Sequence, residues 1–357
     1  MQSPLHALHS ANHAVLQDVA GKPVPVGYGD FGAEADAVEH GAGVMDWSAG
    51  GVIGVRGPDA ALFLNGVTTN NVKALAKGRA QENLLCASKG KILHAVWVVR
   101  TKDDEFLVIT EPGETDAVMQ YLDTYHVRED LVMGVAGLSR LEVLGPRAPQ
   151  ALAAAGLTLP ATGTYAPNAH GGAPVLTMHV PLGALPRFML LTPPPAAPGV
   201  VEALLKEPSA RLVGLTAWDE ARTWAKVPRF PVDFGPDHLP AEAGVYTHIA
   251  FDKGCYVGQE IHARMHYRGH PNRKLVALAI PEPSAADLRV GSELFHGAEL
   301  AGHITSLAQR PRDGLRAAIA MIRYPLAAAR TALSPAANAP AVMGVAPVAS
   351  DLGTART

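Results

Sequence analysis

The sequence predicts an α+β protein with a small all-β module at its C-terminal end. Helix and strand patterns follow one another without regular strand–helix–strand alternation, and neighbouring strands are joined by short turns, which is typical of antiparallel pairing. After Gly269 the pattern changes to short strands with frequent turns. With 357 residues, 48% hydrophobic and 18% charged, the chain is long enough for two or three cores.

The N-terminal part contains helices and strands in mixed order. Apolar residues at helical spacing predict a helix over 4–20, and a loop rich in glycine and proline follows at 21–32. The next elements are bounded by glycine, proline or polar clusters. They are helices over 33–43, 59–65 and 114–126, and strands over 52–55, 80–87, 92–100, 106–110 and 138–144.

The second half begins with GPRAPQALAAAG, a turn that leads into a helix. Residues 193–198 are rich in proline and predict a stiff connector. Further helices are expected over 217–224 and from Gln259 onward. The C-terminal module has strands over 274–280, 293–295, 302–307 and 317–322. The tail from Ser334 is rich in alanine and proline, and the pattern leaves open an edge strand over 342–348.

Composition excludes several classes of function. A net charge of −3 gives no broad basic field, so we do not expect direct nucleic-acid binding. The N-terminal residues lack a leader pattern, and no apolar run approaches the ~20 residues of a membrane span. The 15 histidines are scattered without metal-ligand spacing, so we expect no metal site. Two cysteines outside any CxxC pair favour the reducing cytoplasm.

The stretch FDKGCYVGQE contains Cys255, one of the two cysteines. Gly254 and Gly258 allow a tight turn, and the helix expected from Gln259 would bring the thiol near a helix N-terminus. The helix dipole and Lys253 would then both favour a thiolate. Residue chemistry alone leaves two interpretations open, a reactive cysteine and a buried, inert one packed as a small hydrophobe.

The residues after Cys255 are polar and basic. Gln259 and Glu260 either orient the thiol, bind a partner, or, for Glu260, simply complement the helix dipole. A basic run follows, which is either an anion-binding patch or a solvated helix face. We favour the solvated face because no aromatic residues interleave for base stacking. The run consists of His262, Arg264, His266, Arg268, Arg273 and Lys274.

KGCYVGQE with the trailing ARMHYRG resembles the signature of the YgfZ family of folate-binding, iron–sulfur-related proteins. That family shares its fold with the T-protein, the aminomethyltransferase of the glycine cleavage system. LHALHSANHAV and AVEHGAGVMDWSAGGVIGVRGPDAALFLNGVTTNNV resemble the T-protein's N-terminal segments, and AGHITSLAQ and AAIAMI resemble its barrel strands. The resemblance implies two interleaved α+β subdomains over 1–269, a C-terminal β-barrel over 270–333 and a tail over 334–357.

The resemblance also implies a function. It suggests a protein that supports iron–sulfur cluster assembly or repair, including clusters of tRNA-modifying enzymes, with Cys255 as the catalytic, reactive centre. The expected cofactor is tetrahydrofolate or a related folate, and the expected partners are folate and iron–sulfur proteins or assembly factors. The motif residues expected to contact a ligand or partner are Lys253, Gly254, Tyr256, Gly258, Gln259, Glu260 and Arg264. The candidates for a folate pocket are Arg222, Asp219, Thr110 and His94.

The chain departs from the T-protein where the transfer chemistry lies. A Gly-Gly-Ile-Ile-Asp-Asp run of the T-protein corresponds to residues 89–95 here, KGKILHA, so both carboxylates are absent and His94 cannot supply a permanent negative charge. The pterin-binding glutamate also has no counterpart in PLGALPRFMLLT. Two alternatives stay open, a tetrahydrofolate-dependent aminomethyltransferase or demethylase and a non-catalytic folate-binding scaffold.

Overall fold

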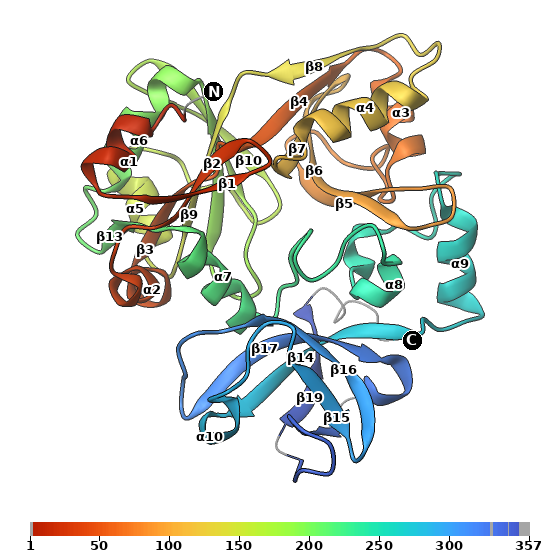
Figure 1. Ribbon diagram of the computed structural model, residues 1–357. Coiled ribbons are helices and arrows are strands. Elements are labelled where there is room, and N and C mark those ends of the chain that lie inside the picture. Colours follow the sequence, from red (N-terminus) through yellow and green to blue (C-terminus); the bar gives the residue numbers. More distant parts are fainter. Residues whose placement is uncertain (1–2, 329–330, 342, 350–357) are drawn as a thin grey trace. The chain divides into compact units, whose positions relative to one another are not determined.

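The structure is a computed structural model that describes residues 3–328, 331–341 and 343–349 (Figure 1). The chain forms two compact units. Unit 1 consists of residues 1–83 and 95–218, and unit 2 consists of residues 84–94 and 219–357. A short segment from the first third of the chain, Leu84–His94, therefore belongs to the same unit as the C-terminal module.

Two sheets form the framework of the N-terminal half. One has the order β5-β6-β7-β4-β8, the other β10-β11-β12-β9-β3-β13, and in the second sheet β13 runs parallel to β3. Strands β5 and β6 continue from unit 1 into the segment assigned to unit 2. The strands are β3 (Ala42–Asp46), β4 (Gly50–Arg56), β5 (Ala80–Cys86), β6 (Ile92–Lys102), β7 (Glu105–Pro112), β8 (Val132–Ala136), β9 (Ser139–Leu144), β10 (Tyr165–His170), β11 (Ala173–His179), β12 (Arg187–Thr192) and β13 (Ala210–Leu212).

The helices of this half bury apolar faces against these sheets. Leu152 and Val200, from two of these helices, pack in one core with Leu141 and Val143 of β9. All side chains of β9 are buried, so both faces of this strand are covered. The mixed order of helices and antiparallel strands confirms the predicted α+β class. The helices are α1 (His6–Ala11), α2 (Phe31–His40), α3 (Ala60–Val67), α4 (Thr115–Tyr125), α5 (Ala148–Ala154), η1 (Pro194–Ala196), α6 (Ala197–Leu204) and α7 (Leu215–Trp224).

The predicted helix over 4–20 is wrong beyond Ala11. Strands β1 (Val15–Val19) and β2 (Lys22–Gly27) follow instead and pair antiparallel. Ala20 and Gly21 connect them with φ angles of 50° and 77°, the left-handed pair that a two-residue hairpin turn requires. The prediction of a stiff connector over 193–198 is also wrong, because η1 and the first turn of α6 lie there. Proline is compatible with the first turn of a helix.

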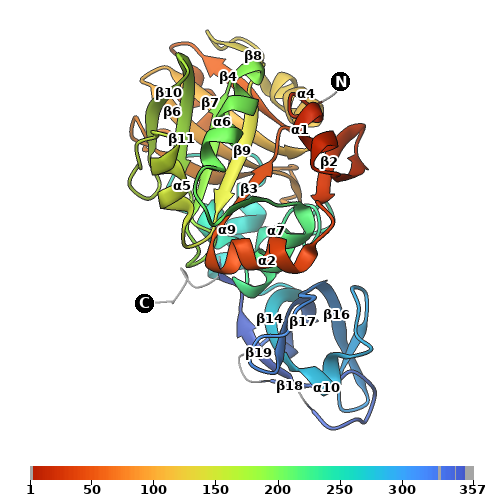
Figure 2. The same cartoon turned by 90° about the vertical axis from the view of Figure 1, so that its left-hand side faces the viewer.

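The C-terminal module is a six-stranded sheet of order β15-β16-β17-β14-β19-β18. Its outer strands meet where Phe295 and Ser334 exchange two backbone hydrogen bonds of 2.9 Å, so the sheet nearly closes into a barrel. The predicted all-β module is confirmed (Figure 2). Its strands contribute to one apolar core. The strands are β14 (Arg273–Pro281), β15 (Glu293–His296), β16 (Glu299–Leu307), β17 (Leu315–Arg323), β18 (Ala332–Leu333) and β19 (Met343–Pro347).

The expectation of an edge strand over 342–348 needs correction. β19 pairs with β14 on one side and with β18 on the other, so it is an inner strand of the barrel sheet. Val342 and residues 350–357 of the predicted tail lie outside the described residues. The division of the chain after residue 269 stays a prediction.

The remaining helices of unit 2 are short. Among the described residues, none of the helices in either unit is long and apolar enough to cross a membrane. The helices of unit 2 are α8 (Pro240–Ala243), η2 (Tyr246–His248), α9 (Gln259–Tyr267), α10 (Glu282–Ala285) and η3 (Tyr324–Leu326).

Candidate functional site

The motif FDKGCYVGQE forms a loop that leads into α9. Gly258 caps the helix in the left-handed conformation, with φ of 88°, and the helix starts at Gln259. Cys255 is exposed and lies three residues before this cap. The prediction that the helix dipole acts on the thiol stays a prediction.

The motif loop packs against the turn between β5 and β6. A Cβ on Gly258 would lie 2.9 Å from the carbonyl oxygen of Ala87 and 3.1 Å from Cα of Gly90. A Cβ on Gly90, whose φ is 74°, would lie 2.9 Å from Cβ of Ile261. Both glycines are needed because two backbones approach each other more closely than any side chain permits. The motif thus lies against the turn at Gly90, in residues 89–95, which the sequence analysis compares with the T-protein run.

His262 fixes this contact. Its Nε2 lies 2.8 Å from the carbonyl oxygen of Gly90, and its Nδ1 lies 3.3 Å from the hydroxyl of Tyr256. The carbonyl can only accept, so Nε2 carries the proton and Nδ1 accepts from the tyrosine. Burial lowers the pKa of His262, although the hydrogen bond to the Gly90 carbonyl acts in the opposite direction. The lowered pKa favours the neutral ring. The prediction that His262 belongs to a solvated basic face is wrong, because α9 buries this side against the turn.

Lys253 is buried, with only 8% of its surface exposed. Its Nζ lies 5.0 Å from the centre of the Tyr256 ring. Burial lowers the pKa of Lys253 to about 7. The lowered pKa reduces the positive charge that Lys253 carries near neutral pH, so it weakens the expected support of Lys253 for a Cys255 thiolate.

The second cysteine lies behind the motif loop. A Cβ on Gly258 would lie 3.4 Å from Cβ of Cys86, and Cys86 is buried at the end of β5. Burial raises the pKa of the Cys86 thiol and also that of the Tyr256 hydroxyl. Among the described residues neither Cys86 nor Cys255 forms a disulfide.

The other motif residues are accessible. Glu260 pairs with Arg264 one helical turn later, at 3.2 Å, and both side chains are exposed. Apart from its chain neighbours, no described atom lies within 4 Å of a Cβ built on Gly254. Gln259 is partly exposed at the start of α9. These residues present a surface to solvent around Cys255, while Tyr256 and Gly258 anchor the loop.

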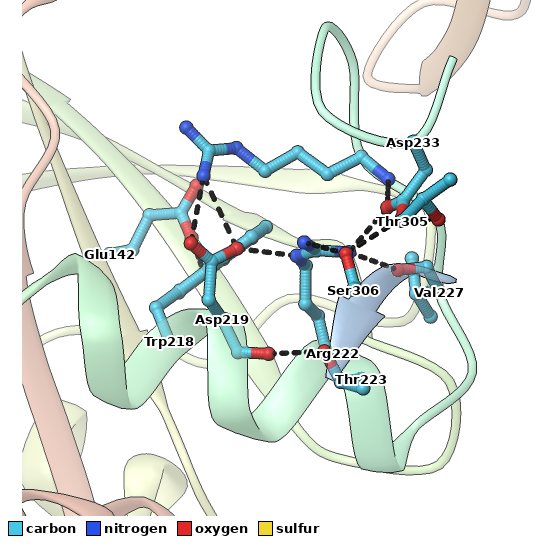
Figure 3. Close-up of polar contacts among 10 residues, drawn as sticks. Glu142, Trp218, Asp219, Arg222, Thr223, Val227, Asp233, Thr305 and Ser306 are labelled. Carbon is cyan, nitrogen blue, oxygen red and sulfur yellow. Dashed lines mark hydrogen bonds and ion pairs between the residues drawn. The ribbon is translucent and has the colours of Figure 1, made fainter. Parts of the chain in front are cut away.

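Arg222 lies in a second cluster of unit 2 (Figure 3). Its guanidinium donates from Nε to Asp219 at 2.5 Å, from Nη1 to Asp233 at 2.6 Å and from Nη2 to the hydroxyl of Ser306 at 2.8 Å. Nη1 also donates to the carbonyl of Val227 at 3.3 Å. Burial opposes the charge, but Asp233 and Asp219 outweigh it and raise the pKa of Arg222. The guanidinium therefore joins α7, the following loop and barrel strand β16.

Asp233 is the centre of this cluster. Its Oδ1 accepts from Ser306 at 2.7 Å and from Thr305 at 2.5 Å, and its Oδ2 accepts from the backbone amide of Arg229 at 2.9 Å. The Arg229 guanidinium donates to both oxygens of Asp219, at 3.2 and 3.1 Å. Asp219 keeps 32% of its side chain exposed, so of the two predicted pocket residues it is the one that a ligand can reach. Sequence reasoning missed Asp233.

The other two pocket candidates lie in different surroundings. Thr110 is buried in unit 1, where its hydroxyl accepts from the Gly51 amide at 3.0 Å and contacts the Thr115 hydroxyl at 2.9 Å. These contacts join β4, β7 and α4. His94 is partly exposed on β6 in unit 2, with its ring centre 6.5 Å from that of Phe230. The structure thus brings Arg222 and Asp219 together, whereas Thr110 lies in unit 1, and its place in a folate pocket stays a prediction.

Unit 1 contains a buried carboxylate that sequence reasoning also missed. Glu142 of β9 accepts from Arg140 at 2.5 Å and from Trp218 at 3.0 Å, and Arg187 lies 3.7 Å away. Burial opposes the charge, but the two arginines and these hydrogen bonds lower the pKa of Glu142. The sequence contains one indication of this buried carboxylate, an acidic residue inside the strand SRLEVL. Among the described residues, His, Cys, Asp and Glu side chains form no group of three that could hold a metal ion.

Comparison with known proteins gives consistent results. The family model described as the GCVT N-terminal domain matches residues 5–253. An aminomethyltransferase from Corynebacterium aurimucosum is 30% identical over 337 residues, which cover 90% of each chain. One from Streptomyces coelicolor is 30% identical over 336 residues, which cover 90% of this chain and 89% of the relative.

The crystal structure of glycine cleavage system aminomethyltransferase T from Bartonella henselae superposes with a TM-score of 0.87 over 98% of both chains, at 21% identity. This similarity confirms the predicted T-protein-like fold with its C-terminal barrel. The family model spans more than two thirds of the chain, and the relatives match along nine tenths of it. On this evidence, the chain belongs to the GCVT family.

Proposed function

We propose that this chain is a folate-binding member of the GCVT family that supports iron–sulfur cluster assembly or repair, as its resemblance to YgfZ proteins implies. Cys255 is the reactive centre. The observation that carries this proposal is the exposed thiol of Cys255, on a loop packed against the turn at Gly90. The thiol is exposed on a loop that packs against this turn, an arrangement that suits reaction with a partner.

The segment after that turn supports a chemistry other than aminomethyl transfer. His94 and Ala95 stand where the T-protein run carries two aspartates. A histidine cannot supply the permanent negative charge that stabilises an iminium-like state. A lone thiolate cannot hold a cluster either, since stable sites use about four ligands. Cys255 would therefore act together with a small thiol or with ligands from an iron–sulfur partner protein.

Complementation tests the role of the thiol. A strain that lacks this protein would receive the wild type, Cys255→Ser or Cys86→Ala, and the activities of its iron–sulfur enzymes would be measured. We expect Cys86→Ala to restore activity, because Cys86 is buried behind the loop. Cys255→Ser should leave it near the level of the deficient strain. Full restoration by Cys255→Ser would refute the catalytic role of the thiol.

Folate binding is proposed at Asp219. A carboxylate can accept two parallel N–H bonds from a pterin edge, and two arginines hold this one in a fixed orientation. Calorimetry with tetrahydrofolate should show binding to the wild type and about tenfold weaker binding to Asp219→Asn, from the loss of a charge-assisted hydrogen bond. Asp237→Asn, at an exposed loop carboxylate of the same unit, is the matched control. Equal tetrahydrofolate affinities for wild type and Asp219→Asn would exclude Asp219 as the carboxylate that binds the pterin.

Aminomethyl transfer to tetrahydrofolate is the second candidate function. The identity of 30% to proteins named aminomethyltransferase favours it. Turnover of an aminomethyl donor by the purified protein with tetrahydrofolate would support this candidate over the first. Absence of turnover in a preparation that binds folate would leave the thiol-centred function.

A further inference from the structure

Unit 1 contains a pocket at the end of β4 that the proposed function does not use. Its volume is about 480 Å³. Three segments line it, namely the end of β4 with the glycine that follows, the turn between β6 and β7, and the residues that lead into β8. All the lining residues belong to unit 1, so the pocket is complete within one compact unit.

The backbone around Gly57 holds the three segments together. In the sheet, β4 lies between β7 and β8 (Figure 1). The amide of Gly57 donates to the carbonyl oxygen of Asp104 at 2.9 Å, on the β7 side. A Cβ on Gly57, whose φ is 144°, would lie 2.4 Å from the carbonyl oxygen of Asp130, on the β8 side. This glycine therefore fixes the segments of Asp104 and Asp130 on opposite sides of the end of β4.

The charged side chains of the pocket are only partly paired with one another. Arg56 lies directly across from Glu105 of β7 and Val132 of β8, so these three side chains point to the same face of the sheet. Glu105 is paired with Lys102 at 2.7 Å. The charges of Glu105 and Lys102 therefore compensate each other, and the guanidinium of Arg56 is available for a ligand.

The remaining charges are one guanidinium and two carboxylates. In the part of the chain that the structure describes, Arg56, Asp104 and Asp130 form no side-chain hydrogen bond and no ion pair, and all three are exposed. An arginine in the middle suits a carboxylate, and an aspartate on each side suits an ammonium group. Two strand spacings, about 10 Å in total, separate the flanking strands, which the four-carbon stem of lysine spans together with its hydrogen bonds. Val132, 56% exposed, offers an apolar surface to that stem.

We propose that this pocket binds a free basic amino acid of the size of lysine. Arg56 binds the α-carboxylate, and Asp104 and Asp130 bind the α-ammonium and the side-chain ammonium groups. Because these side chains are exposed, each ion pair contributes little, and we expect a dissociation constant on the order of 1 mM. The site includes neither Cys255 nor Asp219, so its test is independent of the proposed function.

NMR titration of the full chain tests this site. Amide spectra of the isotope-labelled wild-type protein would be recorded with L-lysine, L-norleucine and cadaverine. Norleucine has the same carbon stem without the second amine, and cadaverine has both amines without the carboxylate. We expect L-lysine to shift the amides of residues 56–57, 104–105 and 130–132. It should bind about three- to tenfold more tightly than either analogue, from one additional charged contact.

Two variants separate the groups of the pocket. Arg56→Gln should weaken the binding of L-lysine about three- to tenfold, and it should not weaken that of cadaverine, which has no carboxylate. Asp130→Asn should weaken the binding of both ligands by a similar factor. Arg128→Gln is the matched control, because Arg128 is exposed in the same loop and does not line the pocket.

Equal affinities of the wild type for L-lysine and norleucine would overturn the proposal, and so would amide shifts confined to other parts of the chain. An absence of shifts up to about 10 mM L-lysine would overturn it as well. The same holds if Arg56→Gln and Arg128→Gln bind L-lysine equally well. Because the comparison of ligands uses the wild-type protein, it remains decisive even where a variant does not fold.

Discussion

The hydroxyl of Tyr256 lies 3.3 Å from Nδ1 of His262. Nε2 of the same ring donates a hydrogen bond to the carbonyl of Gly90. This relationship joins the loop that carries Cys255 to a turn far away in the sequence. Because both ring nitrogens are used, only one tautomer of neutral histidine fits. The geometry of the motif therefore depends on a buried residue of α9.

Replacing His262 should loosen this connection. His262→Phe keeps an aromatic ring but leaves the buried Gly90 carbonyl and the Tyr256 hydroxyl without this partner, which we expect to cost about 1–3 kcal/mol. Urea unfolding would measure the loss. His303→Gln, at an exposed position of barrel strand β16, should change stability by less than about 0.5 kcal/mol. Equal stability of His262→Phe and wild type would contradict the assigned hydrogen bonds.

Two glycines of the motif should respond differently to the same substitution. Gly258→Ala places a methyl group 2.9 Å from the Ala87 carbonyl oxygen and forces alanine to a φ of 88°, so we expect a cost of about 1–3 kcal/mol. Gly254→Ala meets open space and should cost much less. Thermal unfolding of both variants is the measurement. Similar melting temperatures would show that the loop does not pack on the turn in this way.

Removing one partner of the buried ion pair between Arg222 and Asp233 should lower the free energy of unfolding substantially. Asp233→Asn leaves the Arg222 guanidinium buried without its main counterion, which typically costs about 3–5 kcal/mol. Asp219→Asn affects a carboxylate that is one third exposed, so a smaller loss is expected. Chemical unfolding of the two variants compares them directly. A larger loss for Asp219→Asn would reverse the assigned order of the two carboxylates.

Lys253 should give stability a characteristic pH dependence. The pKa of this amine falls from 10.5 to about 7 on folding, so between these values the unfolded chain binds the extra proton. The contribution of this group is therefore least favourable below pH 7, and it improves as pH rises toward 10, by at most about 1.4 kcal/mol per unit. Unfolding of wild type and Lys253→Met from pH 6 to 9.5 measures the difference. A difference that does not change with pH would contradict the burial of this amine.

Much of the fold could be predicted from residue patterns. The strands of the barrel were evident because β-branched and aliphatic residues alternate with turn residues after Gly269. The N-terminal helix was extended too far because Val15 and Leu16 continue the helical spacing of Leu5 and Leu8. The hairpin depends on the left-handed Ala20-Gly21 pair, and alanine gives little sign of that conformation.

The site was predicted only in part. The glycines around Cys255 indicated a tight, accessible loop, and the exposed thiol of the structure agrees with that interpretation. The burial of Lys253 and His262 could not be predicted, because both residue types are usually solvated. The turn that covers His262, at Gly90, is distant in the sequence. The partners of Arg222 were equally hidden, since Asp233 and Ser306 become neighbours only through the tertiary fold.

The assignment of Leu84–His94 to unit 2 has a consequence for synthesis of the chain. Gly90 and His262 are 172 positions apart, so at translation rates of about 5–20 residues per second the turn leaves the ribosome roughly 9–34 s before α9 is complete. During that interval β5 and β6 can pair with each other, but the apolar face around Cys86 has no helix to cover it. The nascent chain thus exposes this face until translation reaches the Cys255 motif, and the first segment of unit 2 can complete its packing only after that point.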